Sequence, residues 1–120
     1  MLKKLQILLQ NEIDPAYAKR AFFIFREIES LRPKTVLDVG CGRGFYLKAL
    51  TLYPFIKKIY GVDINKLYIA KAKSLIDDKR VIINNASIES LPFSENTFDC
   101  VISSEILEHI PDVDKGLKEI

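Results

Sequence analysis

The stretch of residues 36–44, which reads VLDVGCGRG, constrains the fold more than any other part of this chain. Its first residues are apolar strand formers, and Gly40, Gly42 and Gly44 follow at every second position. A strand that ends in such glycines predicts a tight turn, where a ligand lies along bare backbone. Asp38 lies within the strand, and burying a carboxylate without a partner is costly. We therefore expect the ligand to place a cationic group near Asp38.

Strand and helix patterns alternate along the rest of the chain. Asp14 and Pro15 form a typical helix start, and the helix that they begin is expected to end before Pro33. A further short amphipathic helix is predicted in the first dozen residues. Strands are predicted over 35–39, 58–64, 81–86 and 98–103, and helices over 45–52, 65–76 and from about residue 112. This alternation predicts an α/β fold with a Rossmann-like, open, mainly parallel sheet and helices on both faces.

The fourth predicted strand has an apolar sequence, and no later strand follows to cover its far side. An uncovered apolar edge invites pairing with another chain. Two explanations stay open: the sequence is a piece of a longer protein, which we favour, or two copies form a homodimer through this strand. We expect a helical cap over residues 1–33 and a Rossmann-like ligand-binding domain over residues 34–120, incomplete at its C-terminal end.

Composition argues against several classes of protein. Eighteen basic residues against sixteen acidic ones leave a net charge of +2, too small to indicate a nucleic-acid partner. The cysteines, Cys41 and Cys100, and the single histidine, His109, lack the spacing of metal ligands, so no metal site is expected. Reduced thiols are typical of a cytoplasmic protein, which is the location that we expect. No apolar run has the length of a membrane span, so no membrane partner is expected.

A second acidic residue narrows the class of ligand. Asp63 follows Gly44 by nineteen residues and closes the second predicted strand, where a carboxylate can accept hydrogen bonds from both hydroxyls of an unmodified ribose. A dinucleotide fits poorly, because Asp38 repels a pyrophosphate and Phe45 occupies the place of the third glycine in the G-x-G-x-x-G fingerprint. A ligand with a ribose and an ammonium group, but without the need for phosphates, fits better. S-adenosylmethionine meets these conditions.

Four consecutive motifs resemble those of the class I S-adenosylmethionine-dependent methyltransferases. They are DVGCGRG at residues 38–44, GVDIN at 61–65, NASIESLPF at 85–93 and FDCVISSEILEHIPD at 98–112. The resemblance covers residue 35 to the C-terminus and implies the first four strands of a seven-stranded fold. It implies transfer of a methyl group from the sulfonium of S-adenosylmethionine to an unidentified acceptor, with S-adenosylhomocysteine as the product.

The resemblance also implies where the cofactor binds in the first half of the site. It places the methionine amino group near Asp38, directly or through water. Asp63 is implied to hold the ribose hydroxyls, with Ile64 beside the adenine. The turn residues implied to line the methionine and ribose are Gly40, Cys41, Gly42 and Gly44.

The third and fourth motifs complete the implied site. Ser87 stands where the family often has an aspartate that contacts the adenine amino group, and Ile88 offers its backbone N–H to the adenine ring. Ser103 and Ser104 follow the fourth strand and are implied to lie beside the methyl donor.

No residue is assigned to catalysis, because transfer from a sulfonium needs mainly positioning. Glu105 and His109 stay open between catalysis and packing, and Asp99 is expected to be structural. Two other functions remain as alternatives: a non-catalytic module that binds the cofactor or regulates a partner, and a nicotinamide-dependent oxidoreductase. Three aromatic residues of the first long helix are expected to pack in the core, namely Phe22, Phe23 and Phe25.

Overall fold

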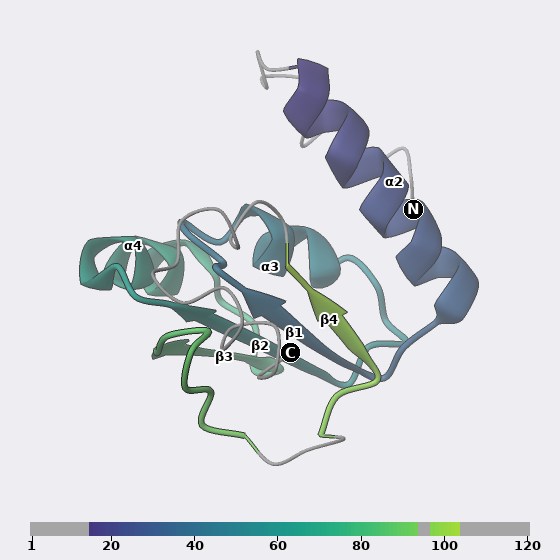
Figure 1. Ribbon diagram of the computed structural model, residues 1–120. Helices are drawn as coiled ribbons and strands as arrows, with labels where there is room; N and C mark the ends of the chain where they lie inside the picture. The colour runs from purple at the N-terminus through teal and green to yellow at the C-terminus, as the bar shows by residue number, and fades with distance from the viewer. Residues whose placement is uncertain (1–14, 94–96, 104–120) are drawn as a thin grey trace.

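The computed structural model describes residues 15–93 and 97–103, in which helices and strands alternate as the sequence predicts (Figure 1). The elements in chain order are α2 (Pro15–Leu31), β1 (Thr35–Val39), α3 (Phe45–Leu50), β2 (Lys58–Asp63), α4 (Lys66–Leu75), β3 (Val81–Asn85) and β4 (Cys100–Ile102). Their strands form one parallel sheet in the order β3-β2-β1-β4. The Rossmann-like fold class is therefore confirmed. The helices predicted in the first dozen residues and after residue 112 lie outside the described residues.

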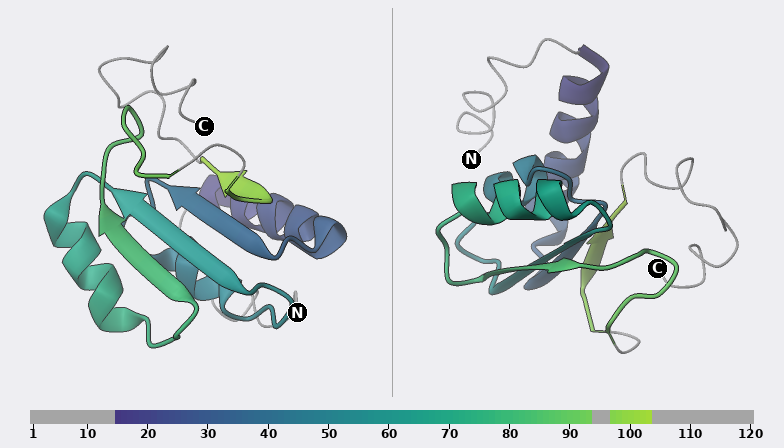
Figure 2. Two further views of the ribbon diagram at one scale, coloured as in Figure 1. Left: turned by 90° about the horizontal axis from the view of Figure 1, so that it is seen from below. Right: turned by 90° about the vertical axis from the view of Figure 1, so that its left-hand side faces the viewer.

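One face of the sheet carries the three helices of the described residues (Figure 2). Side chains alternate between the two faces of a strand, and this face receives Val36, Ile59, Ile83 and Ile102. Each large apolar side chain buried here contributes about 1.5–3 kcal/mol, so this core is a main source of stability. The buried helix residues that complete it include Phe25 and Ile28 of α2, Leu47 and Leu50 of α3, and Ile69 and Ala72 of α4.

The opposite face is covered by the segment that joins β3 to β4. Ile88 of this segment packs against Leu37, Val39 and Val62 of the sheet. Three aromatic rings extend the cluster, with centroids 4.9–5.4 Å apart in edge-to-face contacts. Within the described residues this face carries no helix. The expectation of helices on this second face therefore concerns residues outside the described ranges. The three rings belong to Tyr60, Phe93 and Phe98.

Several element ends lie one or two residues inside the predicted ranges, and the contacts explain two of these differences. The helix predicted from residue 65 begins at Lys66, because Asn65 is its N-cap and its Oδ1 accepts hydrogen bonds from the N–H groups of Leu67 (3.0 Å) and Tyr68 (3.1 Å). The last strand begins only at Cys100. Of the two residues before it, Phe98 packs in the aromatic cluster and Asp99 contacts the start of β1.

That second contact belongs to Asp99, whose Oδ2 accepts hydrogen bonds from the N–H groups of Lys34 (2.8 Å) and Thr35 (3.3 Å). The structural role expected for Asp99 is confirmed. The prediction that Phe23 belongs to the core is wrong, since its side chain is 64% exposed. Phe25 takes the buried face of α2, and a residue two positions away on a helix points to nearly the opposite side.

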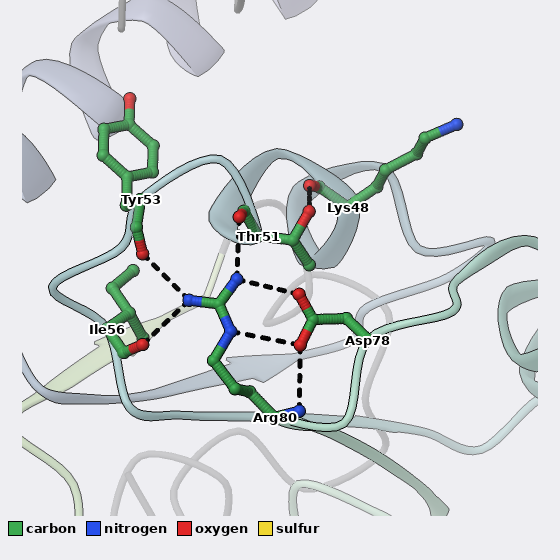
Figure 3. A network of polar contacts seen from close by, with 6 residues as sticks. All are labelled: Lys48, Thr51, Tyr53, Ile56, Asp78 and Arg80. Carbon is green, nitrogen blue, oxygen red and sulfur yellow. Dashed lines mark hydrogen bonds and ion pairs between the residues drawn. The ribbon is translucent and has the colours of Figure 1, made fainter.

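Arg80 organises the edge of the sheet where the strands begin (Figure 3). Its guanidinium donates hydrogen bonds of 2.7–2.9 Å to the carbonyls of Thr51, Tyr53 and Ile56. It also forms a two-point ion pair with Asp78, at 3.1 and 2.8 Å, which lowers the pKa of that carboxyl. The network joins the α3–β2 connection to the start of β3. The glycine turn lies at the other edge, where the strands end, so this network is separate from it.

Candidate cofactor site

The turn after β1 uses backbone conformations that favour glycine. Gly40, Gly42 and Gly44 have φ angles of 74°, 57° and 93°, in the left-handed region that L side chains rarely adopt. A Cβ on Gly44 would lie 2.9 Å from Cδ1 of Ile76 and 3.0 Å from Cβ of Ala72. A Cβ on Gly42 would meet no described atom within 4 Å. The turn is therefore tightly packed at Gly44 and open at Gly42, where a ligand has room along the backbone.

Hydrogen bonds tie this turn to the end of β2. The N–H groups of Gly40 and Cys41 both donate to the carbonyl of Val62, at 2.8 and 3.0 Å. The N–H of Gly42 donates to Oδ2 of Asp63 at 2.9 Å. The glycine turn and the acid at the end of the second strand are thus in direct contact.

Asp63 has its carboxylate fixed from two sides. Oδ2 accepts from Gly42, and Oδ1 accepts from the N–H of Asn65 at 2.8 Å. A carboxylate oxygen has two acceptor positions, so each oxygen retains one for a further donor. The side chain is partly exposed at the end of the sheet. This geometry leaves Asp63 able to accept two hydroxyl groups.

Asp38 is a buried acid with an unsatisfied oxygen. Its side chain is 2% exposed, and it lies in register between Gly61 of β2 and Ile102 of β4. Its Oδ2 is buried and has no hydrogen-bond partner among the described residues. Burial, followed by the charge of Asp63, raises the pKa of this carboxyl well above its ordinary value. A buried oxygen of this kind indicates a partner that the described residues do not supply.

Cys41 contributes its backbone to the turn and its side chain to packing. The thiol is 7% exposed, and a Cβ on Gly61 would lie only 3.1 Å from its Sγ. Burial raises the pKa of the thiol far above its ordinary value, with the charges of Asp38 and Asp63 acting in the same direction. The thiol therefore stays protonated near neutral pH and is not a nucleophile.

The residues predicted to contact adenine lie around the end of β2 and β3. Ile64 follows Asp63 directly and is 63% exposed. The hydroxyl of Ser87 accepts a hydrogen bond from the N–H of Glu89 at 3.1 Å, which shapes a small turn after β3. The side chain of Ile88 is 3% exposed and points into the core of the helix-free face. Any contact of Ile88 with a ligand therefore involves its backbone.

The residues predicted after the fourth strand are described only in part. Ser103 follows β4 directly, and its Oγ is buried without a hydrogen-bond partner among the described residues. Ser104, Glu105 and His109 lie outside the described residues.

The strand order brings the predicted groups into a row along one edge of the sheet. From β3 to β4, the row contains Ser87, Asp63, the Asp38 strand with its glycine turn, and Ser103. It crosses the position between β1 and β4 where the strand order reverses, which is the usual ligand position in open parallel sheets. The site can therefore hold an extended ligand of mixed polar and apolar character.

Two features of the site were not expected from the sequence. The guanidinium carbon of Arg43 lies 5.1 Å from the centroid of the Tyr68 ring, a cation–π contact between the turn and α4. The side-chain amide of Asn85 donates a 2.8 Å hydrogen bond to the carbonyl of Asp63 and holds the ends of β3 and β2 together. The sequence signal for the contact between Arg43 and Tyr68 was an arginine between two turn glycines, together with an aromatic residue in α4, the second helix after the turn.

Comparisons with known proteins agree with this geometry. A family described as "Methyltransferase domain" matches residues 37–120. The chain is 35% identical over 112 residues to the mitochondrial arginine-hydroxylase NDUFAF5 of Mus musculus, which covers 93% of this chain and 30% of that protein. It is 36% identical over 91 residues to a ubiquinone biosynthesis O-methyltransferase of Coxiella burnetii, covering 74% and 38%. The solved structure of YcgJ from Bacillus subtilis has a TM-score of 0.71 at 29% identity, covering 82% and 43%.

The chain belongs to the methyltransferase-domain family, because the family match extends over most of its length. The resemblance to class I methyltransferases found in the sequence is thereby confirmed. The chain spans about a third of the length of these two curated relatives. One of the two is named as a hydroxylase, so membership in the family does not by itself define the reaction.

Proposed function

We propose that this chain is the cofactor-binding part of an S-adenosylmethionine-dependent methyltransferase. The observation that carries the proposal is the buried Asp38 carboxylate, whose Oδ2 has no partner among the described residues and which lies in the strand that ends at the glycine turn. The amino group of a bound methionine moiety supplies the cation that this acid lacks. The cofactor therefore fits the residues that are present, and family membership supports the same function.

The contacts of the neighbouring residues support a division of the site into three parts. Asp38 binds the amino group of the methionine moiety, and the open backbone at Gly42 lies along the methionine and ribose. Asp63 binds the ribose hydroxyls with its two remaining acceptor positions. Ile64 and Ser87 flank the adenine, with the exposed side chain of Ile64 against one face of the ring.

When bound, S-adenosylmethionine supplies an activated methyl group on a sulfonium centre. What the chain contributes is orientation: its strand ends hold the nucleoside and the amino-acid part at fixed positions. The thiol of Cys41 takes no part in the transfer, because it stays protonated and buried. Ser103 lies on the β4 side, where we propose that the methyl donor meets the acceptor. No catalytic role is assigned to Glu105 or His109.

The alternative functions predict different ligand behaviour. A nicotinamide-dependent oxidoreductase must place a pyrophosphate beside the turn, where the carboxylate of Asp38 opposes it. A non-catalytic module binds S-adenosylmethionine without transferring its methyl group. The arginine-hydroxylase among the relatives shows that other reactions are named in proteins similar to this chain.

Titration calorimetry of the chain with S-adenosylhomocysteine tests the proposal, and NADH serves as the comparison ligand. We expect saturable one-site binding of S-adenosylhomocysteine and no measurable binding of NADH. Binding of NADH alone, or of neither ligand by a folded chain, contradicts the proposed function. A second assay with tritiated S-adenosylmethionine and an extract as the source of acceptors then separates an enzyme from a non-catalytic module.

Three further properties are proposals from the sequence. We propose a helical cap over residues 1–33, although α2 shares its core with the sheet, and a cofactor-binding domain over residues 34–120.

We also propose that two copies form a homodimer through the outer edge of β4. This edge faces an apolar groove of about 600 Å³ beside α2. Sedimentation tests the homodimer. We propose a cytoplasmic location, to be tested by fractionation. None of the helices in the described ranges is long and apolar enough to cross a bilayer.

A further inference from the structure

Arg43 and Tyr68 close a ring of contacts around the Asp63 carboxylate. Oδ2 of Asp63 accepts from the N–H of Gly42 at 2.9 Å, and its Oδ1 accepts from the N–H of Asn65 at 2.8 Å. Oδ1 of Asn65 in turn accepts from the N–H of Tyr68 at 3.1 Å. The Tyr68 ring receives the guanidinium of Arg43, which follows Gly42 in the chain. The ring of contacts therefore begins and ends at the glycine turn.

The contact between Arg43 and Tyr68 lies outside both cores. Arg43 is exposed and the Tyr68 side chain is 38% exposed, and neither residue belongs to a buried cluster. In the part of the chain that the structure describes, the guanidinium of Arg43 forms no ion pair with a carboxylate. Ile69 and Ala72 anchor α4 to the sheet independently of this contact. Folding does not require the contact, so its effect is expected at the site.

We propose that Arg43 and Tyr68 are positioning residues that hold the glycine turn against Asp63 and so prepare the site for the nucleoside part of the cofactor. The inference rests on the proposed function. A Cβ on Gly42 would meet no described atom within 4 Å, so no side chain packs at this point of the turn, and its N–H is held by the hydrogen bond to Asp63. The cation–π contact connects the next residue of the turn to α4 and limits its movement away from the carboxylate.

This role predicts which ligands are affected. A ligand needs Asp63 and the turn in fixed positions whenever it contains the ribose, whether or not it carries the amino-acid part. Loss of the contact is therefore expected to weaken S-adenosylhomocysteine and 5′-methylthioadenosine by the same factor. An exposed cation–π contact is worth about 0.5–1 kcal/mol, which corresponds to a roughly two- to fivefold change in Kd.

The test is calorimetry of both ligands with the unmodified chain, with Arg43→Ala, with Tyr68→Ala and with the double variant. Tyr68→Phe is the matched control, because it keeps the ring and is expected to keep the affinity. We expect the Kd of each alanine variant to rise roughly two- to fivefold for both ligands. The Kd of the double variant is expected to rise no further than that of the single variant with the larger loss of affinity. The melting temperature is expected to fall by no more than about 6 °C, the shift that loss of this contact produces in a domain of this size.

Several results would overturn the inference. Loss of affinity for S-adenosylhomocysteine alone means that Arg43 contacts the amino-acid part directly. Additive losses in the double variant mean that the two side chains act separately. Unchanged affinities in variants of a chain that binds both ligands remove the positioning role while the proposed function stands. Failure of the unmodified, folded chain to bind either ligand contradicts the proposed function itself, and the inference falls with it.

Discussion

The backbone N–H of Gly42 donates a 2.9 Å hydrogen bond to Oδ2 of Asp63, which joins the turn after β1 to the last residue of β2. This hydrogen bond fixes the orientation of the Asp63 carboxylate before a ligand binds. It also fixes the position of the Gly42 backbone relative to that carboxylate. Preorganisation of this kind lowers the cost of ordering the site upon binding.

Replacing Asp63 is expected to weaken ligand binding strongly. Asp63→Ala removes the acceptors for the ribose hydroxyls and releases the N–H of Gly42. Hydrogen bonds to a charged group contribute about 1.5–3 kcal/mol, so we expect the Kd for S-adenosylhomocysteine to rise roughly tenfold to a hundredfold in calorimetry. Asp77→Ala removes the same charge at an exposed position and should bind like the unmodified chain. Equal affinity of the Asp63→Ala variant would count against the proposed site.

Asp38 is expected to make stability depend on pH. Its pKa is raised in the folded chain, so the folded state binds more protons than the unfolded state once the pH passes the ordinary value of 3.8. The free energy of unfolding therefore falls as the pH rises from that value towards the raised pKa. Urea unfolding between pH 5 and pH 8 measures the decline. We expect the free energy of unfolding of the Asp38→Asn variant to change less with pH, and that of the Asp77→Asn control to decline as in the unmodified chain. An unchanged decline in Asp38→Asn would show that Asp38 is not its cause.

Alanine substitutions at Gly44 and Gly42 are expected to affect stability and ligand binding differently. Gly44→Ala combines a φ of 93° with a Cβ 2.9 Å from Ile76, so we expect a loss of about 2–3 kcal/mol in the free energy of unfolding. Gly42→Ala has a φ of 57° but no close neighbour, and should lose only about 1 kcal/mol. Its methyl group enters the space proposed for the ligand. Chemical unfolding and calorimetry of both variants should therefore show Gly42→Ala as the more stable variant and a weak binder. Full affinity in Gly42→Ala would place the ligand elsewhere.

Arg80 is expected to affect stability alone. Arg80→Ala removes the side-chain donor to the carbonyls of Thr51 and Ile56, removes one of the two donors to the carbonyl of Tyr53, and breaks the ion pair with Asp78. We expect a loss of about 2–4 kcal/mol in the free energy of unfolding, measured by urea titration. Arg80→Lys keeps the charge but lacks the planar fork, so it should recover only part of this loss. The folded fraction of either variant should bind S-adenosylhomocysteine normally, because the network lies at the edge of the sheet opposite the glycine turn.

Much of the fold could be predicted from local patterns. The alternation of apolar strands with amphipathic helices indicates the parallel α/β class, and the glycines after β1 indicate a turn with left-handed backbone. Asp38 could be singled out because a carboxylate in an apolar strand is unusual at any position of a sheet. These features depend on residue types and spacing within a few positions of the chain.

Other features depend on which segments meet in space. The exposure of Phe23 follows from which face of α2 packs on the sheet. The cover of the second face by the segment with Ile88 and the contact of Asp99 with the start of β1 follow from the strand order. A sequence pattern assigns a residue to an apolar face but does not say which surface will cover that face.

For this protein, the sequence by itself determined the class of fold, the glycine turn and the two acids that indicate the ligand, because these follow from local backbone and charge requirements. Only the tertiary structure decided that Gly42 binds Asp63, that Arg43 reaches Tyr68 and that Arg80 joins three carbonyls. Such contacts join positions about 20 to 30 residues apart, and their formation depends on the register of the packed strands and helices rather than on local sequence.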